Sequence, residues 1–103
     1  GMQSYRLLLN LQKMDEQSRN ALFSYANTNQ NMLLAIETVG AWNFEITLEV
    51  ESHEELQKQI SNLRAEFKDT IKNVEFIIMF EDDLVYDPYP LKKLERKKLL
   101  KKS

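Results

Sequence analysis

The chain has 103 residues, 43% of them hydrophobic and 29% charged, and its two glycines, two prolines and lack of cysteine exclude a fibrous or disordered protein, disulfides and thiolate chemistry. A chain of this length buries a single core, so we expect one domain at residues 1–90, followed by a basic tail at residues 91–103. Residues 1–90 hold seven Lys or Arg against fifteen Asp or Glu, whereas residues 91–103 hold seven against one, and so acidic a domain is a poor nucleic-acid binder by itself.

The first predicted strand runs from Tyr5 to Leu11. One of its faces is wholly apolar, and the other carries Leu8 between two polar residues. A strand this apolar is typical of the centre of a sheet, so we expect a central position. The apolar face comprises Tyr5, Leu7, Leu9 and Leu11.

A helix is predicted next, with Asp15 as its N-cap, because a carboxylate accepts hydrogen bonds from the N–H groups of the first turn. Its apolar stripe ends in the polar residues 27–31, which predict a loop. The stripe comprises Ala21, Leu22, Tyr25 and Ala26.

Residues 31–50 predict a long β-hairpin. Residues 32–39 are mostly apolar, and residues 42–50 alternate strictly between apolar and polar side chains. Gly40 and Ala41 between them suit a two-residue turn, whose first position needs the positive φ that glycine adopts without strain. This turn fixes the register. The expected opposite pairs are Val39 with Trp42, Glu37 with Phe44, Ala35 with Ile46 and Leu33 with Leu48.

A second helix and a fourth strand follow the hairpin. Ser52 and Glu55 form a capping box, in which each side chain can accept a hydrogen bond from a free backbone donor. One face of the helix then carries Leu56, Ile60, Leu63 and Phe67. Residues 72–84 contain a strand of alternating side chains that ends at Asp82 and Asp83, and the prolines of residues 86–90 predict an extended segment.

The order of these elements is β-α-β-β-α-β, which predicts a ferredoxin-like α+β fold with two helices on one face of an antiparallel sheet. The face of Trp42, Phe44, Ile46 and Leu48 is the more apolar, so we assign it to the helices. The reverse face would expose six apolar side chains, and such a patch usually marks an interface. We therefore expect a sheet-to-sheet homodimer. The six are Leu8, Met32, Leu34, Ile36, Ile77 and Met79.

Signals for catalysis are weak, and we predict no catalytic residue, metal ligand or cofactor. His53 is the only histidine and lies in the capping box, where an exposed first-turn residue is the favoured interpretation. The acidic residues 81–83 can bind a cation, although a solvated strand end is the favoured interpretation. Only Gly1 and Gly40 are glycines, so there is no glycine-rich phosphate loop. Trp42 either lines a ligand cleft or belongs to the core.

No apolar segment is long enough to span a membrane, and no signal peptide precedes the first strand, so we expect a cytoplasmic protein without membrane contact. The basic tail is either a mobile solvated end, which is the favoured interpretation, or a contact for phosphates or an acidic neighbour.

Residues 38–45, Thr-Val-Gly-Ala-Trp-Asn-Phe-Glu, carry a resemblance to a known family. Together with the elements on either side, they resemble the C-terminal effector-binding domain (RAM or ACT-like) of the Lrp/AsnC transcriptional regulators, which typically have Gly-x-Tyr/Trp-Asp here. Further similarities lie at residues 5–9, 67–72 and 86–90. The resemblance covers residues 4–90.

The resemblance implies a domain that dimerises sheet against sheet, assembles further, and binds a small effector, often an amino acid, near the hairpin turn. The effector residues that it implies are Thr38, Gly40, Ala41, Trp42 and Asn43. In this reading Gly40 lets the backbone approach the ligand, and Trp42 supplies an apolar wall. Asn43 departs from the aspartate of the family and so removes a charge that could pair with an ammonium group.

The helix-turn-helix of the family is absent from this chain, and residues 1–5 resemble the junction that leads into the first strand. We therefore expect a ligand-sensing and oligomerisation domain of a regulator whose DNA contacts lie elsewhere. The alternatives are a stand-alone small-molecule-binding domain that regulates a partner protein or enzyme, and a dimeric α+β-barrel enzyme, which shares this topology.

Overall fold

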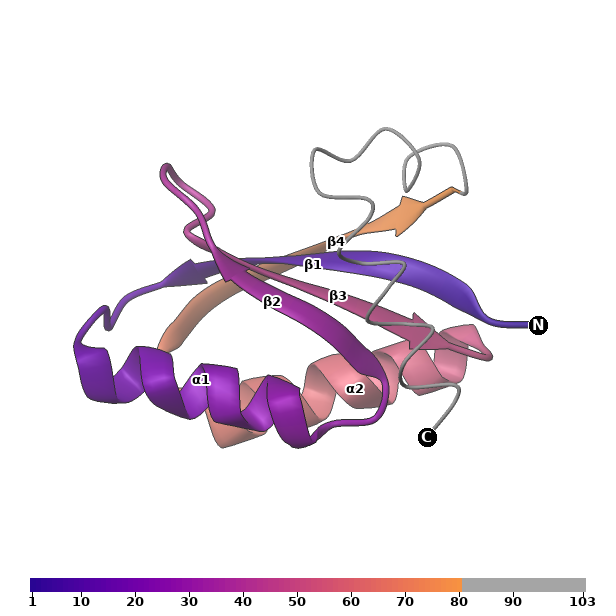
Figure 1. Ribbon diagram of the computed structural model, residues 1–103, viewed down its shortest axis with the longest axis horizontal. Helices are drawn as coiled ribbons and strands as arrows, with labels where there is room; N and C mark the ends of the chain where they lie inside the picture. The colour runs from indigo at the N-terminus through magenta and orange to yellow at the C-terminus, as the bar shows by residue number, and fades with distance from the viewer. Residues whose placement is uncertain (81–103) are drawn as a thin grey trace.

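The computed structural model describes residues 1–80, which form six elements in the predicted order (Figure 1). They are β1 (Gln3–Leu11), α1 (Glu16–Thr28), β2 (Met32–Glu37), β3 (Phe44–Val50), α2 (His53–Glu66) and β4 (Ile71–Met79). The four strands make one antiparallel sheet of order β2-β3-β1-β4, and both helices lie on the same side of it. The ferredoxin-like α+β prediction is confirmed.

The predictions for the acidic residues 81–83, for the end of the fourth strand at residues 82–83, for residues 86–90 and for the basic tail at residues 91–103 lie outside the described residues. Within the described part, neither helix has the length and apolar character needed to cross a membrane.

The sheet carries the core on its helix-facing side. β1 lies between β3 and β4, as predicted for a central strand, and its four predicted core residues are at most 7% exposed. Phe44, Ile46, Leu48 and Val50 of β3 are fully buried, which confirms that this face meets the helices. Trp42 precedes β3, is half-buried and lies outside the buried core.

Both helices begin at their predicted caps. A carboxylate oxygen of Asp15 accepts a hydrogen bond from the Ser18 N–H at 3.1 Å, and Ser52 Oγ accepts one from the Glu55 N–H at 3.1 Å. The carboxylate of Glu55 accepts in turn from the Glu51 N–H at 3.2 Å. Leu22 and Ala26 of the predicted apolar stripe of α1 are buried, whereas Ala21, predicted to belong to the same stripe, is exposed.

The cap of α1 makes stability depend on pH. Hydrogen bonds from the hydroxyl and the N–H of Ser18 lower the pKa of Asp15 in the folded state. Ionised Asp15 therefore stabilises the fold above its unfolded pKa, and this stabilisation is lost as the pH falls through the folded pKa. We expect the chain to lose stability relative to Asp15→Asn, an N-cap that does not titrate, over this acidic range. Urea unfolding of both chains across pH measures the difference, and a pH-independent difference would contradict the prediction.

The predicted register of the hairpin is correct in its middle and wrong at both ends. Glu37 pairs with Phe44 and Ala35 with Ile46, as predicted. A β-bulge between Met32 and Leu34 then places Met32, not Leu33, opposite Leu48. The extra residue turns Met32 to the helix side, where it is 4% exposed, so its assignment to the reverse face is wrong.

The predicted two-residue turn is also wrong, because strand pairing stops at Glu37 and Phe44, and residues 38–43 form a longer loop (Figure 1). The Thr38 hydroxyl donates to the Trp42 carbonyl at 2.6 Å, so this carbonyl is used by a side chain and not by the ladder. Val39 is fully exposed and does not pair with Trp42. The positive φ expected at Gly40 is present, at 125°.

The reverse face mixes apolar and polar side chains. One row across the sheet runs Leu34, Thr47, Arg6, Ile77, and the next runs Ile36, Glu45, Leu8, Glu75. Arg6 Nε lies 3.4 Å from Glu45 Oε1. Ile36 and Ile77 are 38% and 46% exposed, while Met79, on the same face, is buried.

Candidate functional site

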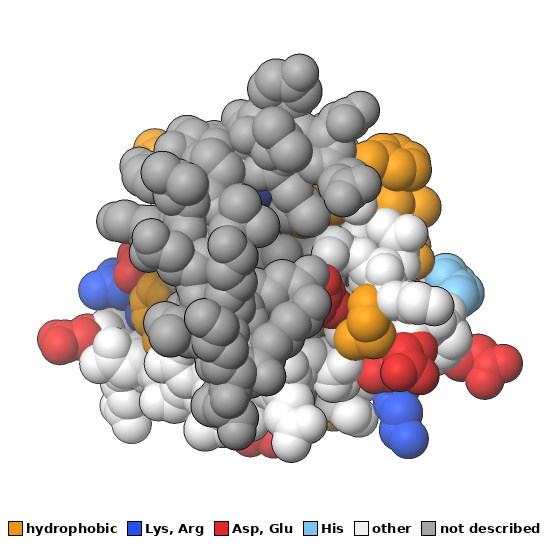
Figure 2. Space-filling model, turned by 45° about the vertical axis from the view of Figure 1, so that its right-hand side comes forward, with side chains coloured by type: hydrophobic (Ala, Val, Ile, Leu, Met, Phe, Trp, Pro, Cys, Tyr) orange, Lys and Arg blue, Asp and Glu red, His pale blue; other side chains and the backbone are white. Residues whose placement is uncertain are grey.

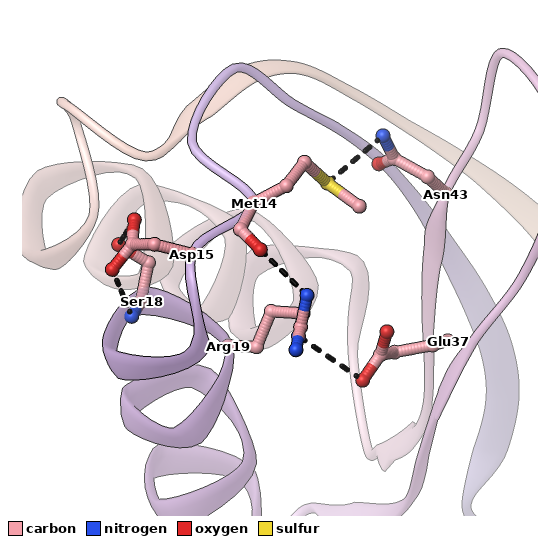
Figure 3. Close-up of polar contacts among 6 residues, drawn as sticks. All are labelled: Met14, Asp15, Ser18, Arg19, Glu37 and Asn43. Atoms are coloured by element: carbon pink, nitrogen blue, oxygen red, sulfur yellow. Dashed lines mark hydrogen bonds and ion pairs between the residues drawn. The ribbon is translucent and has the colours of Figure 1, made fainter.

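The hairpin loop, residues 38–43, is anchored to β1 mainly through Asn43. The Asn43 side-chain oxygen accepts from the Leu11 N–H at 2.8 Å, and the Asn43 N–H donates to the Leu9 carbonyl at 3.0 Å. The Asn43 amide nitrogen also lies 3.3 Å from the Met14 sulfur (Figure 3). One side chain therefore ties the loop to the end of β1 and to the segment that leads into α1.

Two further hydrogen bonds shape the loop. The Thr38 N–H donates to the Asn43 carbonyl at 3.1 Å, and the Asn10 side chain donates to the Ala41 carbonyl at 2.6 Å. Within residues 1–80, and apart from the two chain neighbours of Gly40, no atom lies within 4 Å of the place that a Cβ on Gly40 would occupy, so glycine serves the backbone conformation and not close packing. The loop is fixed at its base and open at its tip.

All five predicted effector residues are neighbours in the sequence and lie in this loop: Thr38, Gly40, Ala41, Trp42 and Asn43. They differ in exposure and in hydrogen bonding. Gly40 and Ala41 are exposed at the tip, and Trp42 is half-buried. The polar side chains of Thr38 and Asn43 already hold the loop, through the Trp42 carbonyl and the Leu11 N–H.

Sequence reasoning missed the charged residues at the base of the loop (Figure 3). Arg19 Nε lies 3.5 Å from Glu37 Oε1, which joins α1 to the last residue of β2. Arg19 also donates through Nη1 to the Met14 carbonyl at 2.6 Å. A signal was present, because the predicted pairing of Glu37 with Phe44 puts a carboxylate on the helix-facing side, where a cation on a helix can reach it.

The loop base combines a cation, an anion and the 40% exposed side chain of Met14 beside an open loop. His53, expected to be an exposed first-turn residue, is exposed at the start of α2 with Gln57 as its polar neighbour. Within residues 1–80, no three His, Cys, Asp or Glu side chains are placed to hold a metal ion.

Comparison with solved structures finds the same fold. The protein PH0061 matches with a TM-score of 0.63 at 18% identity over 79% of this chain and 53% of its own. FFRP-DM1 matches with 0.61 at 10% identity over 76% and 99%. The transcriptional regulator NMB0573 from Neisseria meningitidis, solved in complex with L-Met, matches with 0.65 at 5% identity over 78% and 51%.

This chain therefore spans about half the length of PH0061 and of NMB0573. No protein-family model matches the sequence, and no curated protein matches it.

Proposed function

We propose that this chain is the ligand-sensing and oligomerisation domain of a transcriptional regulator similar to the Lrp/AsnC family, and that it acts by binding and not by catalysis. The observation that carries the proposal is the loop at residues 38–43, which Asn43 fixes beside the charged pair of Arg19 and Glu37. The shared fold with a regulator solved with L-Met supports a small-molecule effector, such as an amino acid.

In this proposal, the loop tip and Trp42 contact the effector, and the loop base supplies charge. DNA would be contacted by another domain of the regulator. The acidic balance of residues 1–90, with seven Lys or Arg against fifteen Asp or Glu, supports this division, because a DNA-binding surface needs an excess of cations.

The oligomerisation part of the proposal rests on exposed apolar side chains. Ile36 and Ile77 of the reverse face are each more than a third exposed, and Leu8 and Leu34 beside them are half-buried. Phe76 and Ile78, on the other side of β4, are 38% and 45% exposed. Figure 2 shows hydrophobic side chains gathered beside His53, the only histidine, and the His53 and Phe76 rings lie 6.5 Å apart.

A second copy packed on the reverse face would cover the four apolar side chains there, which are Ile36, Ile77, Leu8 and Leu34.

Replacing Ile77 by glutamate should convert the dimer into a monomer. Ile77 lies opposite Arg6, so the new carboxylate can pair with a cation within one chain while it interrupts the apolar interface. Light scattering on the purified chain gives the mass, measured without ligand and with each common amino acid in turn. We expect a wild-type dimer whose mass increases with at least one amino acid, and an Ile77→Glu chain at monomer mass in every sample.

The matched control is Ile78→Glu, on the same strand at nearly equal exposure but on the opposite face. It should remain a dimer. A wild-type monomer in all samples would overturn the oligomerisation part. A dimer whose mass responds to no amino acid would overturn the ligand-sensing part.

A further inference from the structure

The charged pair at the loop base is held in place on one side and open on the other. The Met14 carbonyl orients the guanidinium of Arg19 through Nη1, at 2.6 Å. The Arg19 and Glu37 side chains nevertheless remain 34% and 45% exposed. The pair is therefore oriented by the fold and can be reached by a small molecule.

Both groups keep hydrogen-bonding capacity that the described residues do not use. A guanidinium has five N–H donors, and the described contacts of Arg19 engage Nε and Nη1, which leaves Nη2. The Glu37 carboxylate contacts Arg19 through Oε1, which leaves Oε2 among the contacts within residues 1–80. A cationic donor group, Nη2 of Arg19, and an anionic acceptor atom, Oε2 of Glu37, thus belong to neighbouring side chains.

The pair contributes little to stability, so a ligand can replace its internal contact at low cost. Ion pairs at this exposure typically contribute about 0–1 kcal/mol. A ligand with both charges would supply each group with an opposite charge, and a carboxylate can bind a guanidinium through two hydrogen bonds. In a free α-amino acid, the carboxylate and ammonium groups flank a single carbon, so one small ligand can reach both members of a pair whose Nε and Oε1 atoms lie 3.5 Å apart.

The surroundings of the pair favour an apolar ligand side chain. Met14 is 40% exposed, and its sulfur lies 3.3 Å from the Asn43 amide nitrogen at the loop base (Figure 3). A thioether on a flexible side chain adapts to differently shaped apolar groups. Half-buried Trp42 lies in the same loop, directly before Asn43.

We propose that Arg19 binds the carboxylate and Glu37 the ammonium group of a free α-amino acid with an apolar side chain, which rests against Met14. This inference rests on the proposed ligand-sensing function and assigns the residues that recognise the backbone of the ligand.

The test is titration calorimetry with L-methionine, L-leucine and L-phenylalanine on the full chain. Wild-type protein should bind at least one of them, and Arg19→Met and Glu37→Gln should each weaken that binding tenfold or more. Arg64→Met, at an exposed position near the end of α2, is the matched control and should bind as wild type does. Circular dichroism verifies that each variant is folded.

Ligand analogues assign each charge to its partner. The α-hydroxy acid of the same side chain lacks the ammonium group, and we expect Glu37→Gln to change its affinity less than twofold. The amino alcohol lacks the carboxylate, and Arg19→Met should likewise leave its affinity nearly unchanged.

If wild type binds an amino acid and the Arg19 and Glu37 variants bind it equally well, this inference fails while the proposed function stands. If wild type binds none of the three, the inference fails, and the amino-acid series by light scattering decides separately on the proposed function.

Discussion

Replacing Phe44 by alanine should lower the free energy of unfolding by about 3–5 kcal/mol. Phe44 is fully buried at the start of β3, pairs with Leu9 and Glu37, and its ring centroid lies 4.9 Å from that of Phe23. The substitution removes a ring that joins the sheet to α1 and leaves a cavity that neighbouring side chains fill only in part. Urea unfolding followed by circular dichroism measures the loss.

Phe76→Ala is the matched control for Phe44→Ala. Phe76 lies on the same side of the sheet but on the edge strand β4, and it is already 38% exposed. Its removal should cost less than half as much, because less apolar surface leaves a buried environment. Equal losses for the two variants would show that the core does not end where the burial pattern places it.

Asn43→Ala should lower the free energy of unfolding by about 1–3 kcal/mol, and Asn43→Asp should cost much less. Asn43 accepts a hydrogen bond from the N–H of Leu11, a buried residue at the end of β1. Alanine leaves this donor without its partner, whereas aspartate keeps an acceptor oxygen in the same position. Hydrogen exchange of the Leu11 amide should be faster in the alanine variant alone.

The comparison of the two Asn43 variants also tests whether the hydrogen bond to the Leu11 N–H is what holds the loop. The Lrp/AsnC resemblance places aspartate at this position, and either residue can accept from the Leu11 N–H. If Asn43→Asp destabilised the protein as much as Asn43→Ala, the hydrogen bond to Leu11 would not be what holds the loop.

The fold was predictable from the sequence wherever apolar residues recur with a regular period, because such a period identifies the buried face of a strand or helix. Phe44, Ile46 and Leu48 alternate with polar residues, so their common face can be read directly, and all three are buried. Asp15 and Ser52 marked the helix starts because few residue types satisfy free N–H groups.

The bulge in β2 was not predictable in the same way. Residues 32–36 form a continuous apolar run, so no alternation reveals that the register shifts between Met32 and Leu34. The loop was missed because the turn rule considered the backbone alone. The Thr38 hydroxyl competes for the Trp42 carbonyl and opens a loop where a tight turn was expected.

The candidate site likewise has a part that the sequence could predict and a part that it could not. Residues 38–43 are adjacent in the sequence, and a local motif could identify them. Arg19 lies on α1 and Glu37 on β2, and only the packing of these elements brings them within 3.5 Å. Met14 was missed for the same reason, because its contact with Asn43 joins segments far apart in the chain.

The central position of β1 has a consequence for biosynthesis. This strand is synthesised first among the described elements. One of its edges nevertheless stays unpaired until β4 has been synthesised, because Leu11 pairs with Ile71. Pairing over such a sequence separation is slow, because a long loop must close first. Until then, the leucine-rich β1 keeps an open edge, which favours aggregation. On a ribosome, arrival of residues 71–79 is therefore the event that pairs both edges of β1 and completes the four-stranded sheet.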